Sequence, residues 1–374
     1  MITAPPFPIA ALERARRAGL RTLAPVLRVP AVRRSLVERG ARVPVLMTVH
    51  AAAAFVVALL APSLSLVLAP LVLGVPHVAA DVRHLVIRRG LPRTALIALG
   101  GAALVLLLVR VLAETHAASE AQAIRAEHAL ASACLLAGAL AGARAGGWRG
   151  TAWGALAAAL AIGALALRAP RELRIALVQA HNLVAVGIWL LLFRRGGGRT
   201  LIPVVAILLG ASLLGSGALL GVTFHHGALS VFGLHLGAAA DLIAPGAGDA
   251  RGLALTTMFA FLQAVHYAIW LIAIPQDDGR PRGRPSVSMT CRALVRDLSR
   301  VGLGVTVALM VAVGAAGLVA PLRARAIFLS LVTFHAWLEL ALLLFFVARD
   351  GLRRRAAPEP RALARDPRLA RVTP

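Results

Sequence analysis

The sequence predicts an all-α, polytopic integral membrane protein: a bundle of about ten transmembrane helices with both termini in the cytoplasm. Composition and patterning both support this prediction. Hydrophobic residues make up 59% of the 374 and charged residues 15%, whereas a soluble domain carries about a quarter charged residues. Long apolar runs recur between residues 43 and 347, and the arginines between them alternate in density. The lipid bilayer is therefore the expected environment of the chain.

Ten apolar runs are long enough to cross a bilayer, for which a helix needs about 20 apolar residues. In chain order they are 43–61, 64–88, 94–113, 127–143, 151–168, 173–193, 200–222, 254–274, 301–320 and 325–347. The fourth and fifth runs are short and rich in alanine. The runs show no convincing internal repeat.

The arginines predict the orientation of these spans. With the N-terminus inside, the inside segments hold 31 arginines and the outside segments 7. Cytoplasmic loops of membrane proteins carry such an excess of basic residues. Both ends are then cytoplasmic, and the even-numbered spans run from outside to inside. The net charge of +24 follows this loop pattern rather than one basic groove, which argues against nucleic-acid binding.

Four segments lie outside the spans or between them. Residues 1–42 are predicted to form a basic, amphipathic cytoplasmic segment on the anionic leaflet, with a disordered basic tail as the alternative. Within the transmembrane domain 43–347, the inside loop 275–300 is a flexible linker followed by a basic amphipathic piece. The outside loop 223–250 is apolar enough for a re-entrant or interfacial segment. Residues 348–374 are predicted to be a disordered basic tail.

Four histidines are predicted to lie at a common depth. His77, His181, His266 and His335 fall in the second, sixth, eighth and tenth spans. At 1.5 Å of rise per residue they lie within about 10 Å of one another in depth. Ionisable side chains at such depth are functional candidates, and neutral imidazole is a common ligand of iron, copper and zinc. The four histidines therefore predict a metal site within the membrane.

Polar neighbours of these histidines are candidates for orienting them. Asp81 and Glu339 each follow a histidine by four residues, and carboxylates often orient the imidazoles that bind a metal. Gln263 and Tyr267 flank His266 and are the other predicted supporting residues.

Three further histidines are less clearly placed. His84 follows His77 by two helical turns and falls near the inner interface, which favours an interfacial role. His225 and His226 lie at the outer end of the seventh span. The sequence leaves open whether they are an interfacial pair or additional metal ligands.

The stretch from Val75 to Asp81, Val-Pro-His-Val-Ala-Ala-Asp, resembles the Pro-His-Gly-Ala-x-Asp signature of the Brp/Blh family. Pro76, His77 and Asp81 match, and Val78 stands where the family has glycine. These bacterial and archaeal membrane proteins resemble β-carotene-cleaving dioxygenases that use non-haem iron held by histidines. The resemblance implies an iron-dependent oxygenase of the bacterial inner (plasma) membrane that acts on an apolar, lipid-soluble small molecule such as a carotenoid.

Two other functions fit the same residues. Histidines on facing helices can bind haem in an electron-transfer protein. Alternatively, His77, Asp81 and Glu339 can form a proton or ion relay in a coupled transporter. A membrane desaturase is disfavoured, because the chain has no HxxxH box and its only His-His pair is predicted to lie outside. Whether the chain is an enzyme stays open at this level.

Overall fold

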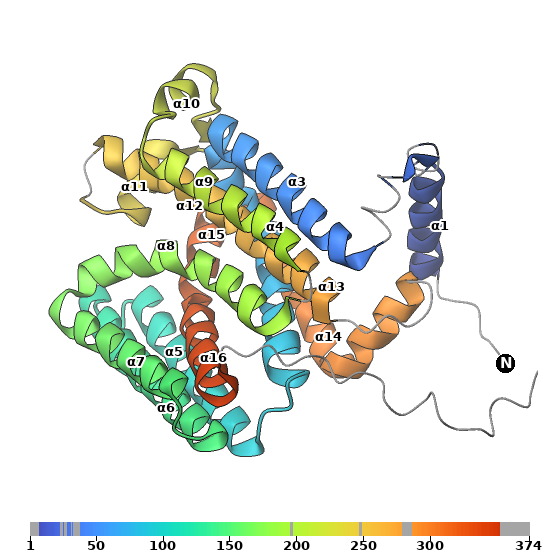
Figure 1. Cartoon of the computed structure of the whole chain (residues 1–374). Helices are drawn as coiled ribbons and strands as arrows, with labels where there is room; N and C mark the ends of the chain where they lie inside the picture. The colour runs from blue at the N-terminus through green and yellow to red at the C-terminus, as the bar shows by residue number, and fades with distance from the viewer. Residues whose placement is uncertain are drawn as a thin grey trace, which may run out of the picture.

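The computed structural model describes residues 7–22, 25, 28–30, 32, 38–194, 197–246, 249–278 and 286–351. Almost all of the described part is helical, and two short strands of two residues each form a hairpin (Figure 1). The longer elements are α1 (Phe7–Thr22), α3 (Arg39–Leu60), α4 (Pro62–Asp81), α5 (Arg93–Glu114), α6 (Glu120–Gly146), α7 (Gly150–Arg168), α8 (Pro170–Ile188), α9 (Leu201–Gly215), α12 (Asp249–Ala268), α14 (Val287–Val319), α15 (Pro321–Leu331) and α16 (Thr333–Asp350). The shorter ones are α10 (Leu220–His226), β1 (Ser230–Val231), β2 (Leu234–His235), α11 (Leu236–Ile243) and α13 (Ile274–Asp278).

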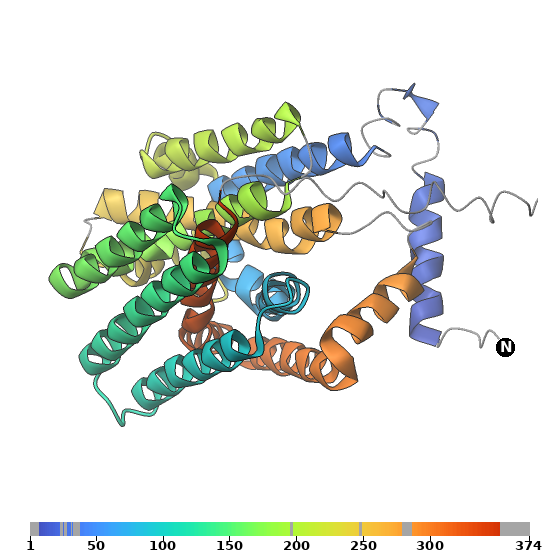
Figure 2. The ribbon, with the colours of Figure 1, turned by 60° about the horizontal axis from the view of Figure 1, so that its bottom comes forward.

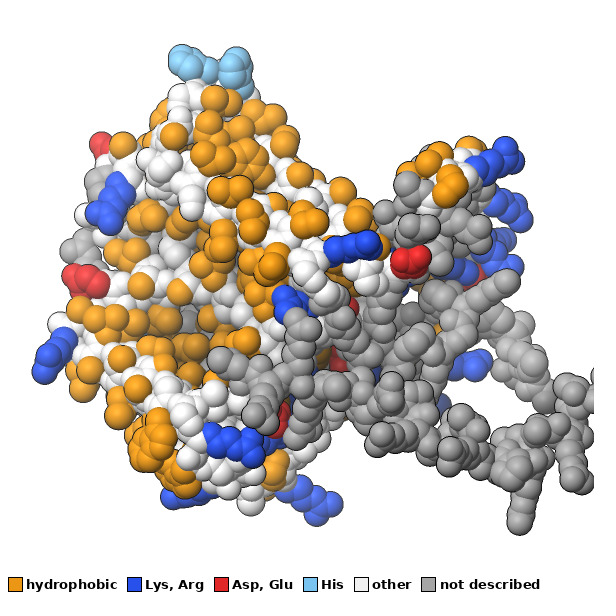
Figure 3. Space-filling model, in the orientation of Figure 1, with side chains coloured by type: hydrophobic (Ala, Val, Ile, Leu, Met, Phe, Trp, Pro, Cys, Tyr) orange, Lys and Arg blue, Asp and Glu red, His pale blue; other side chains and the backbone are white. Residues whose placement is uncertain are grey.

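Ten helical stretches in the described residues are long and apolar enough to cross a membrane. They coincide with the ten predicted spans, which confirms the all-α polytopic bundle. The two alanine-rich runs are the full-length helices α6 and α7. In Figure 3, hydrophobic side chains are spread over the described face of the bundle, and only a few charged side chains lie among them. That distribution is the one expected of a multi-pass membrane protein.

Four alanine-proline pairs shape one end of the bundle, the outer end in the predicted orientation. Ala61, Ala169, Ala244 and Ala320 all have φ between −148° and −136° and ψ between 57° and 74°. Proline disfavours helical backbone in the residue before it, and it is well suited to the first turn of a helix. Helix pairs α3–α4, α7–α8 and α14–α15 are therefore joined by one non-helical residue each. Each of the four pairs precedes a helical span that carries one of the predicted ligand histidines.

The histidine-bearing spans depart from regular α-helix. Three of them continue into π-helical turns, at Val82–Ile87 after α4, Trp189–Phe193 after α8 and Ile269–Ala273 after α12. The fourth is broken at Val332 into α15 and α16, where the backbone leaves the helical region at φ −88° and ψ 2°. Such irregular turns are frequent at functional sites. Inside a membrane they are tolerated where protein or a cavity surrounds them.

Two hydrophobic clusters make up the core, and α16 contributes to both. Phe345 and Phe346 pack into the cluster built around α3, α4, α8, α9 and α12. Trp337 and Ala341 pack into the cluster of α5, α6 and α7. The two groups of helices can be followed on either side of α16 in Figures 1 and 2. The inner faces of α4, α8, α12 and α16 meet between the clusters.

Helix α16 is held against α6 by a ridge of glycines. A Cβ at Gly138 would lie 2.7 Å from the carbonyl oxygen of Ala341, and one at Gly142 would overlap the carbonyl oxygen of Phe345. Small residues spaced by four let membrane helices approach backbone to backbone. This contact fixes the helix that carries His335.

The segments outside the spans differ partly from expectation. The predicted flexible linker and basic piece, 275–300, is helical on both sides of residues 279–285, which lie outside the described residues. Residues from 287 onward belong to α14, which bends at Ser299, where φ is +63°. In the loop 223–250 the structure has the β1–β2 hairpin and α11, whose buried face packs on α12. The predicted tail is described only as far as residue 351.

The N-terminal segment contains the predicted helix, α1. It docks on α14 through Glu13, whose carboxylate accepts a hydrogen bond from the backbone N–H of Val287 at 3.0 Å. A hydrogen bond from Arg16 lowers the pKa of Glu13 to about 2, so this carboxylate stays charged at neutral pH. Residues 1–6 lie outside the described residues, as does most of 23–37.

The predicted orientation can be tested by thiol labelling in a Cys134→Ala background. Cys291 lies near the start of α14, on the predicted cytoplasmic side, and Ala117 lies in the exposed loop between α5 and α6. An impermeant maleimide added to intact cells should label an introduced Ala117→Cys but not Cys291, which should react only after permeabilisation. The reverse pattern would contradict the arginine-based orientation.

Candidate metal centre

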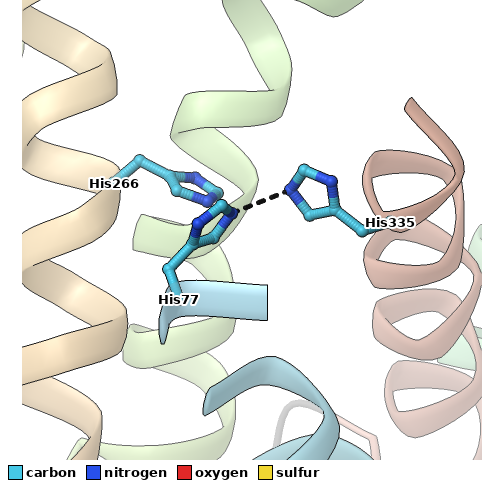
Figure 4. Close-up of side chains that lie close together, drawn as sticks. All are labelled: His77, His266 and His335. Carbon is cyan, nitrogen blue, oxygen red and sulfur yellow. Dashed lines mark hydrogen bonds between the residues drawn. The ribbon is translucent and has the colours of Figure 1, made fainter. Parts of the chain in front are cut away.

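The four predicted ligand histidines converge from four different helices. His77 lies on α4, His181 on α8, His266 on α12 and His335 on α16. Ring centroids are 4.5 Å apart for His181 and His266, and 4.9 Å apart for His77 and His335. In Figure 4, His77, His266 and His335 point towards one another from their separate helices. The grouping expected from depth alone is the grouping that the structure has.

Local backbone contacts fix the tautomers of two of these rings. Nδ1 of His77 lies 3.3 Å from the carbonyl oxygen of Leu73, and Nδ1 of His335 contacts the carbonyl oxygen of Val332. A carbonyl only accepts hydrogen bonds, so each Nδ1 carries the proton and donates it. In a neutral imidazole the other nitrogen, Nε2, then presents a lone pair.

These two lone pairs face each other. Nε2 of His77 and Nε2 of His335 are 3.1 Å apart, the contact dashed in Figure 4. Two acceptors at this distance repel unless a proton or a cation lies between them. Two ligands at 90° on one metal, each with a bond of about 2.1 Å, have nitrogens about 3.0 Å apart. The pair therefore has the spacing of adjacent ligands on one metal ion.

The remaining donors surround this pair. Three overlapping groups bring their ligand atoms within 4.8 Å of one another: His77, His266 and His335; His181, His266 and Glu339; and Asp81, His335 and Glu339. Both nitrogens of His266 are buried and have no hydrogen-bond partner among the described residues, and the same is true of Nδ1 of His181. Unpaired buried donors and acceptors are costly. A cation bound by these atoms would remove that cost, so the residues fit a metal.

Two carboxyl groups complete the centre. Asp81 and Glu339 are 6% and 2% exposed, and their oxygens make no hydrogen bond of good geometry among the described residues. Oε2 of Glu339 lies 3.4 Å from Nδ1 of His181, and Oε1 lies 4.0 Å from Nε2 of His266. Two buried carboxylates side by side require a cation or a shared proton. Their charge matches that of one divalent metal ion.

The expected carboxylate–imidazole pairs are only partly realised. Asp81 and Glu339 were expected to orient the histidines four residues before them, His77 and His335. Those two rings are instead held by backbone carbonyls, because an i−4 or i−3 carbonyl is already within reach of Nδ1 on the same helix. Glu339 reaches across to His181 and His266 instead.

Aromatic and amide groups enclose the centre. The ring of Tyr267 lies 4.5 Å from that of His77, and Gln263 is buried one turn away on α12 with Oε1 unpaired. Arg325 is the first residue of the tenth predicted span, at its outer end. The structure buries it, and its Nε donates a 2.6 Å hydrogen bond to the carbonyl oxygen of Leu66. The outer side of the centre therefore carries a fixed positive charge.

A cavity of about 470 Å³ leads from the histidines towards the outer end of the bundle. This volume is within the range of about 300–1,000 Å³ for small-molecule sites. Its apolar walls include Leu177, Phe259, Leu329 and Leu340, and Ile243 of α11 closes one side. The sequence pointed to the loop that contains α11 without giving it this role.

The outer mouth of the cavity holds charged residues that sequence reasoning passed over. Arg110 hydrogen-bonds Ser330 and pairs with Glu120 at 3.2 Å. Glu127 accepts a 2.9 Å hydrogen bond from the indole of Trp337, and His128 lines the cavity beside it. The adjacent Glu127-His128 at the edge of the fourth span was the available signal. Without the fold, nothing in the sequence joined it to the histidine centre.

The other histidines lie apart from the centre. His225 and His226 are exposed at the end of α10, where histidine side chains gather on the surface in Figure 3. They belong to none of the three ligand groups found among the described residues. Nδ1 of His84 lies 2.8 Å from a carboxylate oxygen of Asp278 near the opposite end of the bundle.

Comparison with protein-family models, with curated proteins and with solved structures finds no match for this chain. The likeness of residues 75–81 to the Brp/Blh signature is therefore an expectation from one short motif.

Proposed function

We propose that this chain is a multi-pass membrane metalloprotein with a non-haem iron centre, an oxygenase that acts on an apolar, lipid-soluble molecule such as a carotenoid. The observation that carries the proposal is the 3.1 Å approach of two imidazole lone pairs inside the membrane-spanning bundle. The resemblance to the Brp/Blh family supplies the choice of iron and of a polyene substrate. Together with that family's distribution, it supports a bacterial inner membrane as the proposed location.

The residues of the centre and of the cavity have separate roles in the proposed reaction. His77, His266 and His335 hold the iron, with His181 as the fourth imidazole. Glu339 contacts His181 and His266 and balances charge together with Asp81. Bound iron would supply the activation of dioxygen, which this set of side chains lacks. The apolar walls of the cavity bind the hydrocarbon, exclude water and bring one of its double bonds to the histidine centre.

The centre is less suited to haem. Two axial imidazoles on opposite faces of a haem have their ligating nitrogens about 4 Å apart, twice an iron–nitrogen bond of about 2.0 Å. The His77 and His335 nitrogens are 3.1 Å apart. The other donors, including Glu339, form overlapping groups of three with His266 or His335, with their ligand atoms within 4.8 Å of one another.

A transport pathway is also less well supported. On the inner side of the histidines the bundle is filled by fully buried aromatic residues, among them Trp189, Trp270 and Phe346. The indole N–H of Trp189 donates a 2.8 Å hydrogen bond to Asp277 there. The cavity lining reaches outward and includes none of these residues. A cavity closed at one end is typical of an enzyme site rather than of a through-route.

Expression in bacterial cells that synthesise β-carotene tests the proposed reaction. Aerated cells with the wild-type chain should lose the absorbance of β-carotene and accumulate shorter polyene aldehydes, as measured by chromatography. Cells with His335→Ala at equal membrane levels should keep the carotene, because one ligand and its fixed lone pair are gone. Equal product from both chains, or product formed without oxygen, would contradict an oxygenase centred on these histidines.

A further inference from the structure

The cavity has a second polar end, on the side away from the histidine centre. Its lining changes from the imidazoles of His77, His181 and His335 to apolar side chains and then to the group at the outer mouth. That group consists of Arg110, Glu114, Glu120, Glu127, His128 and Arg174. A molecule that fills the whole cavity thus meets two chemically different ends.

Most polar atoms at this outer end already have partners. Arg110 is bound by Ser330 and Glu120, and Glu127 accepts the indole N–H of Trp337. Arg174 pairs with Glu120 at 3.4 Å. In these pairs the charged groups already bind one another or a neighbouring side chain. They therefore form a fixed rim around the cavity opening.

His128 is the exception. Its side chain lines the cavity, the residue is 5% exposed, and its Nδ1 is buried without a hydrogen-bond partner among the described residues. Its ring stacks edge-on against Trp337 at 5.8 Å between centroids, which holds it in place. A buried imidazole nitrogen without a partner is unfavourable unless a ligand supplies the missing hydrogen bond.

The charge of the outer end selects the kind of group that His128 can receive. Two arginines face three carboxylates among the cavity-lining residues there, so an anion gains no net attraction. A neutral imidazole can donate or accept a hydrogen bond, according to its tautomer. A hydroxyl or carbonyl group matches both properties.

We propose that the outer end of the cavity binds the neutral polar end of an elongated hydrocarbon. A hydroxyl or carbonyl of that molecule hydrogen-bonds to the imidazole of His128, while its apolar body extends along Leu177 and Leu329 to the histidine centre. This inference rests on the proposed function, whose substrate class it narrows from a pure hydrocarbon to an oxygenated one. His128 is a binding and positioning residue, because it sets which part of the chain reaches the centre.

Binding to the purified, chelator-treated protein tests this without turnover. The probes are β-carotene and its monohydroxylated counterpart, β-cryptoxanthin, and quenching of tryptophan fluorescence reports their affinities. The wild-type chain should bind the hydroxylated probe about tenfold more tightly, the effect of one good hydrogen bond. His128→Phe should bind the two probes equally, and His128→Asn, whose amide can still hydrogen-bond, should restore part of the preference.

His116→Phe is the matched control, since it makes the same change at an exposed loop histidine and should keep the full preference. Equal affinities in the wild-type chain, or a preference unchanged in a folded His128→Phe, would overturn the inference. Either failure is distinguishable from failure of the proposed function. These affinities are measured without metal, whereas the proposed function stands or falls on metal content and oxygen-dependent product.

Discussion

Replacing His77 with alanine is expected to remove the metal from the purified protein. The ring provides one of two lone pairs that face each other at 3.1 Å, and its loss leaves His335 without its nearest partner donor. Loss of a residue that merely orients a ligand costs about 10–100-fold in metal affinity. Loss of a ligand should cost more than that, and elemental analysis of the detergent-purified protein should find the metal content close to background.

His226→Ala is the control for this change. The sequence alone allowed His226 as an additional ligand, but the structure places it exposed at the end of α10. It should retain the wild-type metal content. Equal metal content in folded His77→Ala and wild-type protein would show that His77 is not a ligand. Loss of metal in His226→Ala would require a different ligand set.

Replacing Gly142 with alanine is expected to destabilise the bundle, although alanine is the better helix former by about 1 kcal/mol. The added Cβ would overlap the carbonyl oxygen of Phe345. That atom is backbone and can yield only if α16 moves away from α6. Overpacking of this kind costs about 1–3 kcal/mol. The free energy of unfolding in detergent should fall by about that amount.

Gly154→Ala makes the same change where no atom of the described residues lies within 4 Å of the added Cβ. It should leave the free energy of unfolding unchanged or raise it by up to about 1 kcal/mol. Opposite signs for Gly142 and Gly154 would confirm that backbone contact with α16 is what requires glycine. A fall of equal size for both variants would contradict it.

The fold could be predicted because hydropathy and arginine placement act on whole spans and need no detailed packing. Ten spans of the expected length are present. The common depth of His77, His181, His266 and His335 followed from the same reading, since a histidine's position within a span fixes its depth. The sequence also contained a signal for where these spans begin, because an Ala-Pro pair precedes each of them.

The chemistry at the centre could not be predicted in the same way, because it depends on rotation and tilt of the helices. The sequence paired Glu339 with His335 by spacing, whereas the break at Val332 gives His335 a backbone carbonyl and leaves Glu339 facing His181. Arg325, at the outer end of the tenth predicted span, turns inward and donates a hydrogen bond to a carbonyl of α4. A role for His128 could be inferred only from the cavity, because the cavity connects this residue to the histidine centre.

Metal content and the visible spectrum of the wild-type protein, gently extracted and never exposed to chelator, test the central claim most directly. The proposed function predicts about one equivalent of iron per chain and no Soret band. If the protein shows a cooperative unfolding transition, and so is folded, yet carries no iron, copper or zinc, the metal centre is contradicted. A Soret band would show that the bound cofactor is haem rather than non-haem iron.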